Sequence, residues 1–240
     1  MTSPLFEDFN ERSKEVSKYF IVLKSLEQGE IKLLSMEEIK LLSMERNSGV
    51  NKIKKNDTEL LKTMKASGFL LLYNLVESTM RSAIEAIFDE LQSKRISFDE
   101  IRPELKKIVL KNLKNRNHDK VISNLTAISI DIINAGFDKQ KLFSGNIDGR
   151  KIQETAKEYG FSCTTDHANT GHGEDLKTVK ENRNDLAHGI KSFAEVGRDK
   201  SADDLLKIQE KVVNYLRQIL QNIETYLANQ EYLDSSTTTP

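Results

Sequence analysis

The chain has 240 residues, 38% hydrophobic and 30% charged, which is enough for one folded domain with a solvated surface. Three prolines and 11 glycines are too few for a loop-rich β sandwich, and a net charge of −1 excludes a protein that is basic throughout, so any RNA binding would depend on a local positive potential. The single cysteine, the absence of a secretory signal and the lack of an apolar run of about 20 residues indicate a cytoplasmic, soluble protein with neither a disulfide scaffold nor a membrane span.

Residues 1–56 are expected to form a helix and a variable extension. Apolar residues at largely helical spacing predict the helix over residues 5–27. The eight residues 30–37 are repeated without change as 38–45. Since eight residues rotate a helix by about 80° beyond two full turns, the two copies cannot share one buried stripe. We therefore expect a partly exposed helical extension, followed by a polar loop over residues 46–57.

Residues 57–234 are expected to form a helical bundle. Periodic apolar residues predict a long central helix over residues 58–94 and further helices over 103–115, 119–135, 152–159, 174–188 and from 201 onward. The segments 161–173 and 192–200 are expected to be loops, and 235–240 a disordered tail. Because no hairpin is predicted between these elements, the expected fold class is all-α.

The helix predicted over residues 174–188 carries an arginine in its apolar stripe, at Arg183. The other stripe positions are Leu176, Val179, Leu186 and Ile190. A charge on a buried line is costly unless it is matched, so Arg183 indicates either a structural salt bridge or a site for an anion. His188 lies about 140° around the helix from Arg183, so the two could meet at one phosphate only at a helix end, in a cleft or across a dimer axis. Gly189 places His188 at such an end.

The segment Arg183-Asn184-Asp185-Leu186-Ala187-His188 resembles the R-x4-6-H motif of the HEPN superfamily (higher eukaryotes and prokaryotes nucleotide-binding). Residues 74–79 on the long early helix, and residues 182–189 followed by Ser192-Phe193, are similar to stand-alone bacterial HEPN proteins. The similarity extends from about Leu60 to Tyr232 and leaves the duplicated segment outside. It implies a HEPN-like helical bundle with a long N-terminal helical extension.

The resemblance also implies an activity. HEPN ribonucleases act as homodimers or paired domains, with two such motifs facing one another across the interface. They cut RNA without a metal or other cofactor, using the ribose 2′-hydroxyl as nucleophile, and many are toxins or antiviral-defence effectors. The expectation is a metal-independent endoribonuclease that acts on RNA as a homodimer with a composite active site. An antitoxin or another product of the same operon is the expected regulatory partner.

The chemistry suits the side chains of the motif. Attack by a 2′-hydroxyl needs a base whose pKa lies near neutrality, which assigns proton transfer to His188. The pentacoordinate phosphate gains negative charge that the Arg183 guanidinium can stabilise, and Asn184 can orient the histidine or a phosphate oxygen. Asp185 could fix Arg183 or a residue of a partner subunit.

A supporting group lies on the central helix. Asn74, Glu77 and Arg81 share one helix face. Glu77 either forms an ion pair with Arg81 or holds Arg183 in position without itself contacting the RNA, with Asn74 beside it.

Two further groups could contact RNA. His167 and His172, near Cys163, indicate a polar loop beside the active site; their spacing also permits a zinc site, which the absence of a second cysteine disfavours. Lys111 and Lys114 belong to a basic run that is either a solvated face or a phosphate-tracking surface.

Two alternatives to the ribonuclease remain. One is a catalytically inactive HEPN module that binds nucleotides or a partner protein. In some members of that kind a tyrosine two residues after the histidine is modified, and here that position is Ile190, which excludes this route. The other is a structural helical adaptor, for which loss of Arg183 would harm stability alone.

Overall fold

The computed structural model describes residues 3–30, 58–114, 132–133, 136–137, 142–143 and 145–235. In chain order the helices are α1 (Pro4–Glu27), α3 (Thr58–Ser93), α4 (Pro103–Lys114), α7 (Gly149–Tyr159), α8 (His167–Thr170), the 3₁₀ turn η2 (Gly171–Gly173), α9 (Asp175–Ala187), α10 (Phe193–Arg198) and α11 (Ala202–Ala228). Across these ranges the only β pairing is an isolated bridge between Ile101 and Leu233. The expected all-α fold class is therefore confirmed.

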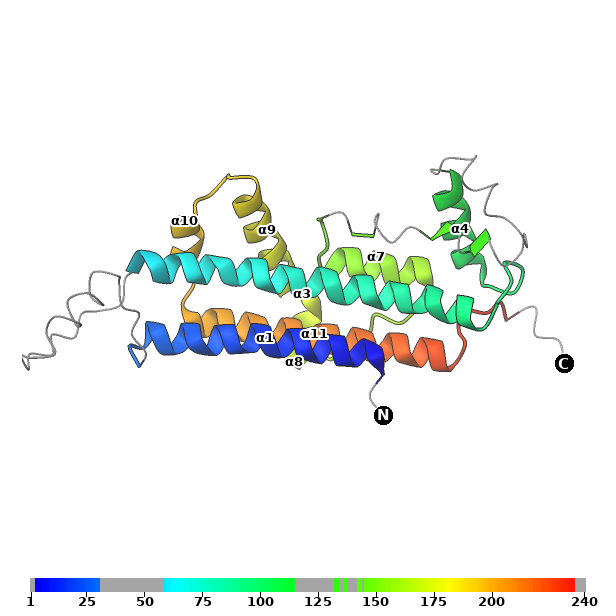
Figure 1. Ribbon diagram of the computed structural model, residues 1–240, viewed down its shortest axis with the longest axis horizontal. Helices are drawn as coiled ribbons and strands as arrows, with labels where there is room; N and C mark the ends of the chain where they lie inside the picture. The colour runs from blue at the N-terminus through cyan, green and yellow to red at the C-terminus, as the bar shows by residue number, and fades with distance from the viewer. Residues whose placement is uncertain are drawn as a thin grey trace, which may run out of the picture.

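The core is a bundle of three long helices, α1, α3 and α11, that run side by side (Figure 1). The central helix α3 packs against both of the others, and also against α9 and α10. It can do so because its sequence is apolar almost all round between Gly68 and Val76. Its most deeply buried residues include Phe69, Leu72, Leu75, Met80 and Ile84.

Helix α1 belongs to this bundle. Phe9, Phe20 and Leu23 are at most 1% exposed and lie in the same apolar core as the buried side chains of α3 and α11. The Gln209 amide also donates to the Ser17 hydroxyl at 3.0 Å, which joins α11 to α1. The helix predicted over residues 5–27 is confirmed, and its place is inside the core rather than in an appended extension.

Helix α7 begins three residues earlier than predicted. The Asp148 carboxylate accepts a hydrogen bond from the Lys151 backbone N–H at 2.9 Å, which caps the helix and allows Gly149 to lie in its first turn. Gly160, with φ of +89°, ends the helix as predicted.

Two segments predicted to be loops contain short helices. In residues 192–200 the prediction was wrong, because Ser192 and Glu195 form a reciprocal capping box that starts α10. In residues 161–173 Asp166 caps α8, which leads into η2. Ser201 and Asp204 form a reciprocal capping box at the start of α11, so the helix predicted from residue 201 onward is confirmed.

Several predictions lie outside the described residues. They are the duplicated segment 30–45 apart from residue 30, the loop over 46–57, most of the helix over 119–135, and the tail after Ser235. In the part of the chain that the structure describes, no helix is long and apolar enough to cross a membrane.

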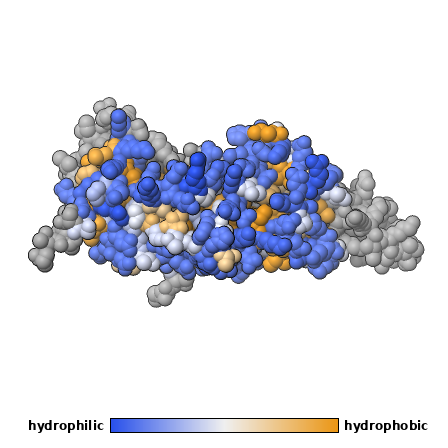
Figure 2. Space-filling view, turned by 180° about the vertical axis from the view of Figure 1, so that it is seen from behind, coloured by the Kyte–Doolittle hydropathy of each residue, from blue (hydrophilic) through white to orange (hydrophobic). Residues whose placement is uncertain are grey.

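Helices α4, α7, α9 and α10 occupy one side of the bundle (Figure 1). Helices α10 and α9 lie over the N-terminal half of α3, and α7 and α4 lie over its other half (Figure 1). The face seen in Figure 2 is mostly hydrophilic, with small hydrophobic patches, one of them at the tip of the projection formed by α9 and α10. The turn between these two helices contains Ile190, which is 69% exposed. The R-x4-H segment therefore ends at a projecting tip.

Candidate active site

The end of α9 is shaped by a glycine cap. Gly189 has φ of +67°, the Ile190 N–H donates to the Asp185 carbonyl at 2.8 Å, and the Gly189 N–H donates to the Leu186 carbonyl at 3.2 Å. This is the Schellman arrangement, which a left-handed residue after the last turn permits. It stops the helix at His188 as predicted and leaves the His188 side chain exposed.

Arg183 points the other way, into the body of the protein. Its guanidinium carbon lies 4.6 Å from the centre of the Tyr73 ring on α3, a cation–π distance. One guanidinium nitrogen donates to the side-chain oxygen of Asn184 at 2.9 Å and, at 3.5 Å, to the carbonyl of Gly145. The arginine is half-buried and is held by an aromatic face, a carbonyl and an amide, all of them uncharged.

No carboxylate neutralises this arginine within the described residues. Glu77 and Glu85 are the acids of α3 that line its cleft, and Glu77 pairs with Arg81 at 2.9 Å instead of with Arg183. Of the two expectations for Glu77, the ion pair with Arg81 is therefore confirmed. With respect to the described residues, the Arg183 guanidinium keeps an unmatched positive charge in a half-buried position, which is the arrangement expected of an anion site rather than of a structural salt bridge.

Tyr73 is the site residue that the sequence did not reveal. It is 4% exposed, and its hydroxyl accepts a hydrogen bond from the Ile147 N–H at 3.2 Å. Burial raises the pKa of this hydroxyl, and the nearby Glu77 carboxylate raises it further, so it stays protonated at neutral pH. Tyr73 thus joins α3 to the segment before α7 and presents its ring to Arg183. Its position inside an apolar run gave no signal of this contact.

An open polar cleft of about 560 Å³ adjoins the arginine. Its walls come from α3, α1 and α9, and its lining includes Arg12, Tyr73, Asn74, Glu77, Arg81 and Arg183. The structure therefore brings Asn74 and Glu77 into the same cleft as Arg183.

The remaining motif residues lie at the tip. The Asp185 carboxylate pairs with Lys191 at 2.7 Å rather than with Arg183, and this pair raises the pKa of Lys191. Among the described residues, the His188 imidazole makes no hydrogen bond or ion pair, and no contact joins it to Arg183. One chain alone therefore does not bring the arginine and the histidine together.

The loop histidines His167 and His172 contact each other, and His172 lines a second cleft. The rings of His167 and His172 are 4.9 Å apart, and His172 Nδ1 is 3.2 Å from the Thr165 hydroxyl. Cys163 instead contacts the Tyr215 hydroxyl at 3.5 Å. No group of three or more histidine, cysteine or acidic side chains in the described ranges is placed to hold a metal ion.

The two lysines expected to track phosphates lie elsewhere. Lys111 and Lys114 are in α4, which lies over the half of α3 away from α9 and α10 (Figure 1). Lys111 lines a separate hollow of about 320 Å³ together with residues at the end of α7. The structure does not bring them to the cleft beside Arg183.

A helical bundle built on one long central helix, with an R-x4-H sequence at the end of a shorter helix packed against it, defines the class of HEPN-like proteins. Comparison with protein families agrees: residues 1–232 match the HEPN_MAE_28990-like HEPN family, and the chain belongs to it. The match starts at residue 1 rather than near Leu60, so it includes α1. Neither the curated proteins nor the solved structures contain a significant match.

Proposed function

We propose that this protein is a metal-independent endoribonuclease whose active site is built on Arg183, Asn184 and His188. The observation that supports this most is the unmatched charge of Arg183, held half-buried at the edge of a cleft by Tyr73. Holding an arginine in this way costs stability unless an anion binds to it. In a HEPN ribonuclease, the anion expected to bind there is a phosphodiester of the RNA substrate.

The reaction assigns a step to each residue. His188 takes the proton from the ribose 2′-hydroxyl, the bond from O2′ to phosphorus forms, and the bond from phosphorus to O5′ breaks as that oxygen takes a proton from water, to which His188 then releases the proton that it took. Arg183 stabilises the negative charge on the pentacoordinate phosphate, and Asn184, bonded to Arg183, keeps the guanidinium in place. The products are a 2′,3′-cyclic phosphate and a 5′-hydroxyl. DNA lacks the 2′-hydroxyl and is not cut by this route.

A second copy of the chain completes the site. Arg183 points inward and His188 outward, so one chain does not place both on one phosphate. Two copies related by a two-fold axis at the α9–α10 tip would bring the histidine of each toward the arginine of the other. Ile190, exposed at that tip, gives the contact an apolar centre.

Cleavage of RNA in the presence of EDTA tests the activity. Wild type is expected to cut a mixed RNA to fragments that end in 2′,3′-cyclic phosphate, while Arg183→Ala and His188→Ala do not. If wild type cuts nothing yet binds nucleotides or a product of its operon tightly, the protein is instead an inactive HEPN binding module.

Mixing the two inactive variants tests the composite site. A heterodimer of Arg183→Ala and His188→Ala keeps one intact arginine–histidine pair, so random exchange should restore about one quarter of wild-type activity. No recovery, under conditions in which exchange is verified, would show that each chain uses its own pair.

The biological role follows from the chemistry. An unrestrained endoribonuclease is harmful to its host, so we assign the protein to the toxins or antiviral-defence effectors, with an antitoxin or operon partner as its restraint. Expression of wild type should arrest growth, whereas His188→Ala at equal abundance should not.

A further inference from the structure

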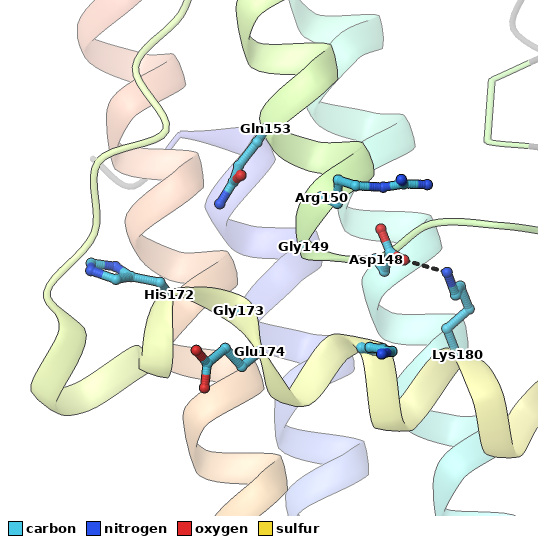
Figure 3. A pocket seen from close by; sticks show the side chains of 9 residues that line it. Asp148, Gly149, Arg150, Gln153, His172, Gly173, Glu174 and Lys180 are labelled. Carbon is cyan, nitrogen blue, oxygen red and sulfur yellow. Dashed lines mark hydrogen bonds and ion pairs between the residues drawn. The ribbon is translucent and has the colours of Figure 1, made fainter.

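A second cleft, of about 650 Å³, opens beside the first turns of α7 and α9 (Figure 3). Its lining includes three cations, Arg150, Lys177 and Lys180, together with Gln153 and His172. Its floor is backbone: a Cβ on Gly149 would lie only 2.7 Å from the Gly173 carbonyl oxygen, so the two segments approach too closely for a side chain between them. The cleft thus has a fixed floor and a rim of positive side chains.

This cleft adjoins the candidate active site through the segment that precedes α7. The segment before α7 runs along α9 and touches it at successive points. Gly145 accepts from Arg183, Asn146 accepts from Asn184 at 3.4 Å, and Asp148 pairs with Lys180. Lys177 lies six residues before Arg183 on the same helix, about 9 Å along its axis. Six residues also rotate the helix by about 120°, so a strand bound at Arg183 would reach the second cleft by passing around α9 beside residues 145–148.

The three cations differ in how firmly they are held. Lys180 is paired with Asp148, whose side chain is 10% exposed, and Figure 3 shows this pair at the edge of the cleft. Arg150 and Lys177 have side chains that are 83% and 73% exposed. Their intrahelical partners, Glu154 at 3.7 Å and Glu181 at 3.8 Å, are long and solvated, so each pair is worth only a few tenths of a kcal/mol.

Arg150 and Lys177 can therefore exchange these partners for a phosphate at little cost. Two acids, Asp148 and Glu174, also line the cleft, so it holds three cations against two carboxylates. Because Lys180 already neutralises Asp148, the cations of the cleft that are left to bind an anion are Arg150 on α7 and Lys177 on α9.

We infer that this cleft is a phosphate-binding subsite for the RNA strand next to the scissile bond, with Arg150 and Lys177 as the contacting residues and His172 and Gln153 available to the adjoining ribose or base. This inference rests on the proposed ribonuclease function, since it places the strand by way of Arg183. The subsite also sets the path of the bound RNA: from Arg183, the strand extends along α9 toward the N-terminus of that helix.

The test measures RNA binding in a chain that cannot cut. On a His188→Ala background, a fluorescein-labelled single-stranded RNA of about 20 nucleotides, longer than typical single-strand sites of about 4–16, is titrated at several salt concentrations. The subsite variant is Arg150→Gln with Lys177→Gln. The matched control is Lys157→Gln with Lys207→Gln, which also removes two positive charges but from exposed positions of α7 and α11 outside both clefts. Lys180 is kept, because its loss would leave Asp148 buried without its partner.

The subsite variant is expected to bind the RNA roughly tenfold more weakly at low salt, and the slope of log K against log salt should become shallower by about 0.7 for each phosphate that the protein no longer neutralises. The control should bind with the slope of the parent. A subsite variant with the parent's Kd and slope overturns the inference.

Cleavage measured in parallel separates this inference from the proposed function. With His188 restored, the subsite variant should lose more kcat/KM on the long RNA than on a dinucleotide, which is too short to reach the cleft. If wild type cuts no RNA but the subsite variant still loses affinity and slope, the ribonuclease proposal fails and the subsite stands. If wild type cuts RNA and the decreases are equal on both substrates, the subsite fails and the ribonuclease stands.

Discussion

Replacement of Tyr73 tests how the candidate site holds its arginine. Tyr73→Phe keeps the ring beneath the Arg183 guanidinium but removes the hydroxyl that accepts from the Ile147 N–H. Tyr73→Leu removes both. Tyr226 offers a matched control, because its buried hydroxyl donates to the Tyr159 carbonyl at 2.9 Å, away from the cleft beside Arg183.

The expected sizes follow from these interactions. Tyr73→Phe leaves a buried N–H without its partner and should cost about 1–3 kcal/mol of stability, and Tyr226→Phe should cost a similar amount. Tyr73→Leu also removes the cation–π interaction, worth about 0.5–2 kcal/mol, and leaves a cavity. Since each kcal/mol shifts the melting temperature of a chain this size by about 2–4 °C, all three decreases in stability are measurable.

The rate of RNA cleavage separates a role of Tyr73 in positioning Arg183 from a role in stability alone. If Tyr73 fixes the guanidinium, Tyr73→Leu should lower kcat by on the order of 100-fold, the decrease expected when a reacting group moves by about 1 Å, while Tyr73→Phe keeps most of it. Tyr226→Phe should melt earlier and cut RNA normally. If Tyr73→Leu, assayed well below its melting temperature, cuts RNA as fast as Tyr226→Phe, then Tyr73 does not position the Arg183 guanidinium for catalysis.

Three further predictions concern stability and reactivity. Gly197→Ala should destabilise the protein by more than about 2 kcal/mol, because a Cβ there would lie 1.8 Å from the Lys62 carbonyl oxygen; chemical denaturation measures the change. Burial raises the pKa of Asp148, but the contacts of its carboxylate with Lys180 and with the Lys151 N–H together outweigh this and lower the pKa below the ordinary value of an aspartate, so the stability from these contacts is present above that ordinary pKa and is lost as the pH falls through the lowered one. Acid titration of Asp148→Asn should accordingly be less steep than that of wild type. Burial raises the pKa of the Cys163 thiol, which should react slowly with a disulfide reagent at neutral pH and fast once the chain is unfolded.

Each of these has a result that would contradict it. Gly171→Ala is the control for Gly197, since a Cβ at Gly171 meets no atom within 4 Å and costs only the strain of φ +54°, about 1–2 kcal/mol. Equal destabilisation by the two substitutions would remove the steric argument. An unchanged acid titration in Asp148→Asn would show that the Lys180 pair contributes nothing, and labelling of native Cys163 at the unfolded rate would contradict its burial.

Long helices were predictable because their signals are local and repeated. The spans of α1, α3 and α11 follow from apolar residues at helical spacing, and the start of α11 follows from the capping pair of Ser201 and Asp204. Helix α10 was missed although Ser192 and Glu195 carry the same signal, because six residues are too few for an apolar period to emerge.

The candidate site was predictable only in part. Arg183 stood out because it interrupts an apolar stripe, and Asn74 and Glu77 were found on the correct face of α3. Tyr73 was not, because its interactions join residues 74 and 110 positions apart, and no local pattern encodes such pairings. The subsite beside Arg150 depends in the same way on two helices that meet only in the folded chain.

The place of α1 in the core affects how the protein is made. Residues 4–27 are synthesised early, yet the surface they pack against includes α11, which ends at Ala228. The hydrogen bond from Gln209 to Ser17 joins residues 192 positions apart, and closing so long a loop is slow. The bundle that supports Arg183 therefore cannot close until α11 has left the ribosome. The candidate site at Arg183 is accordingly completed late, after both α1 and α11 have been synthesised.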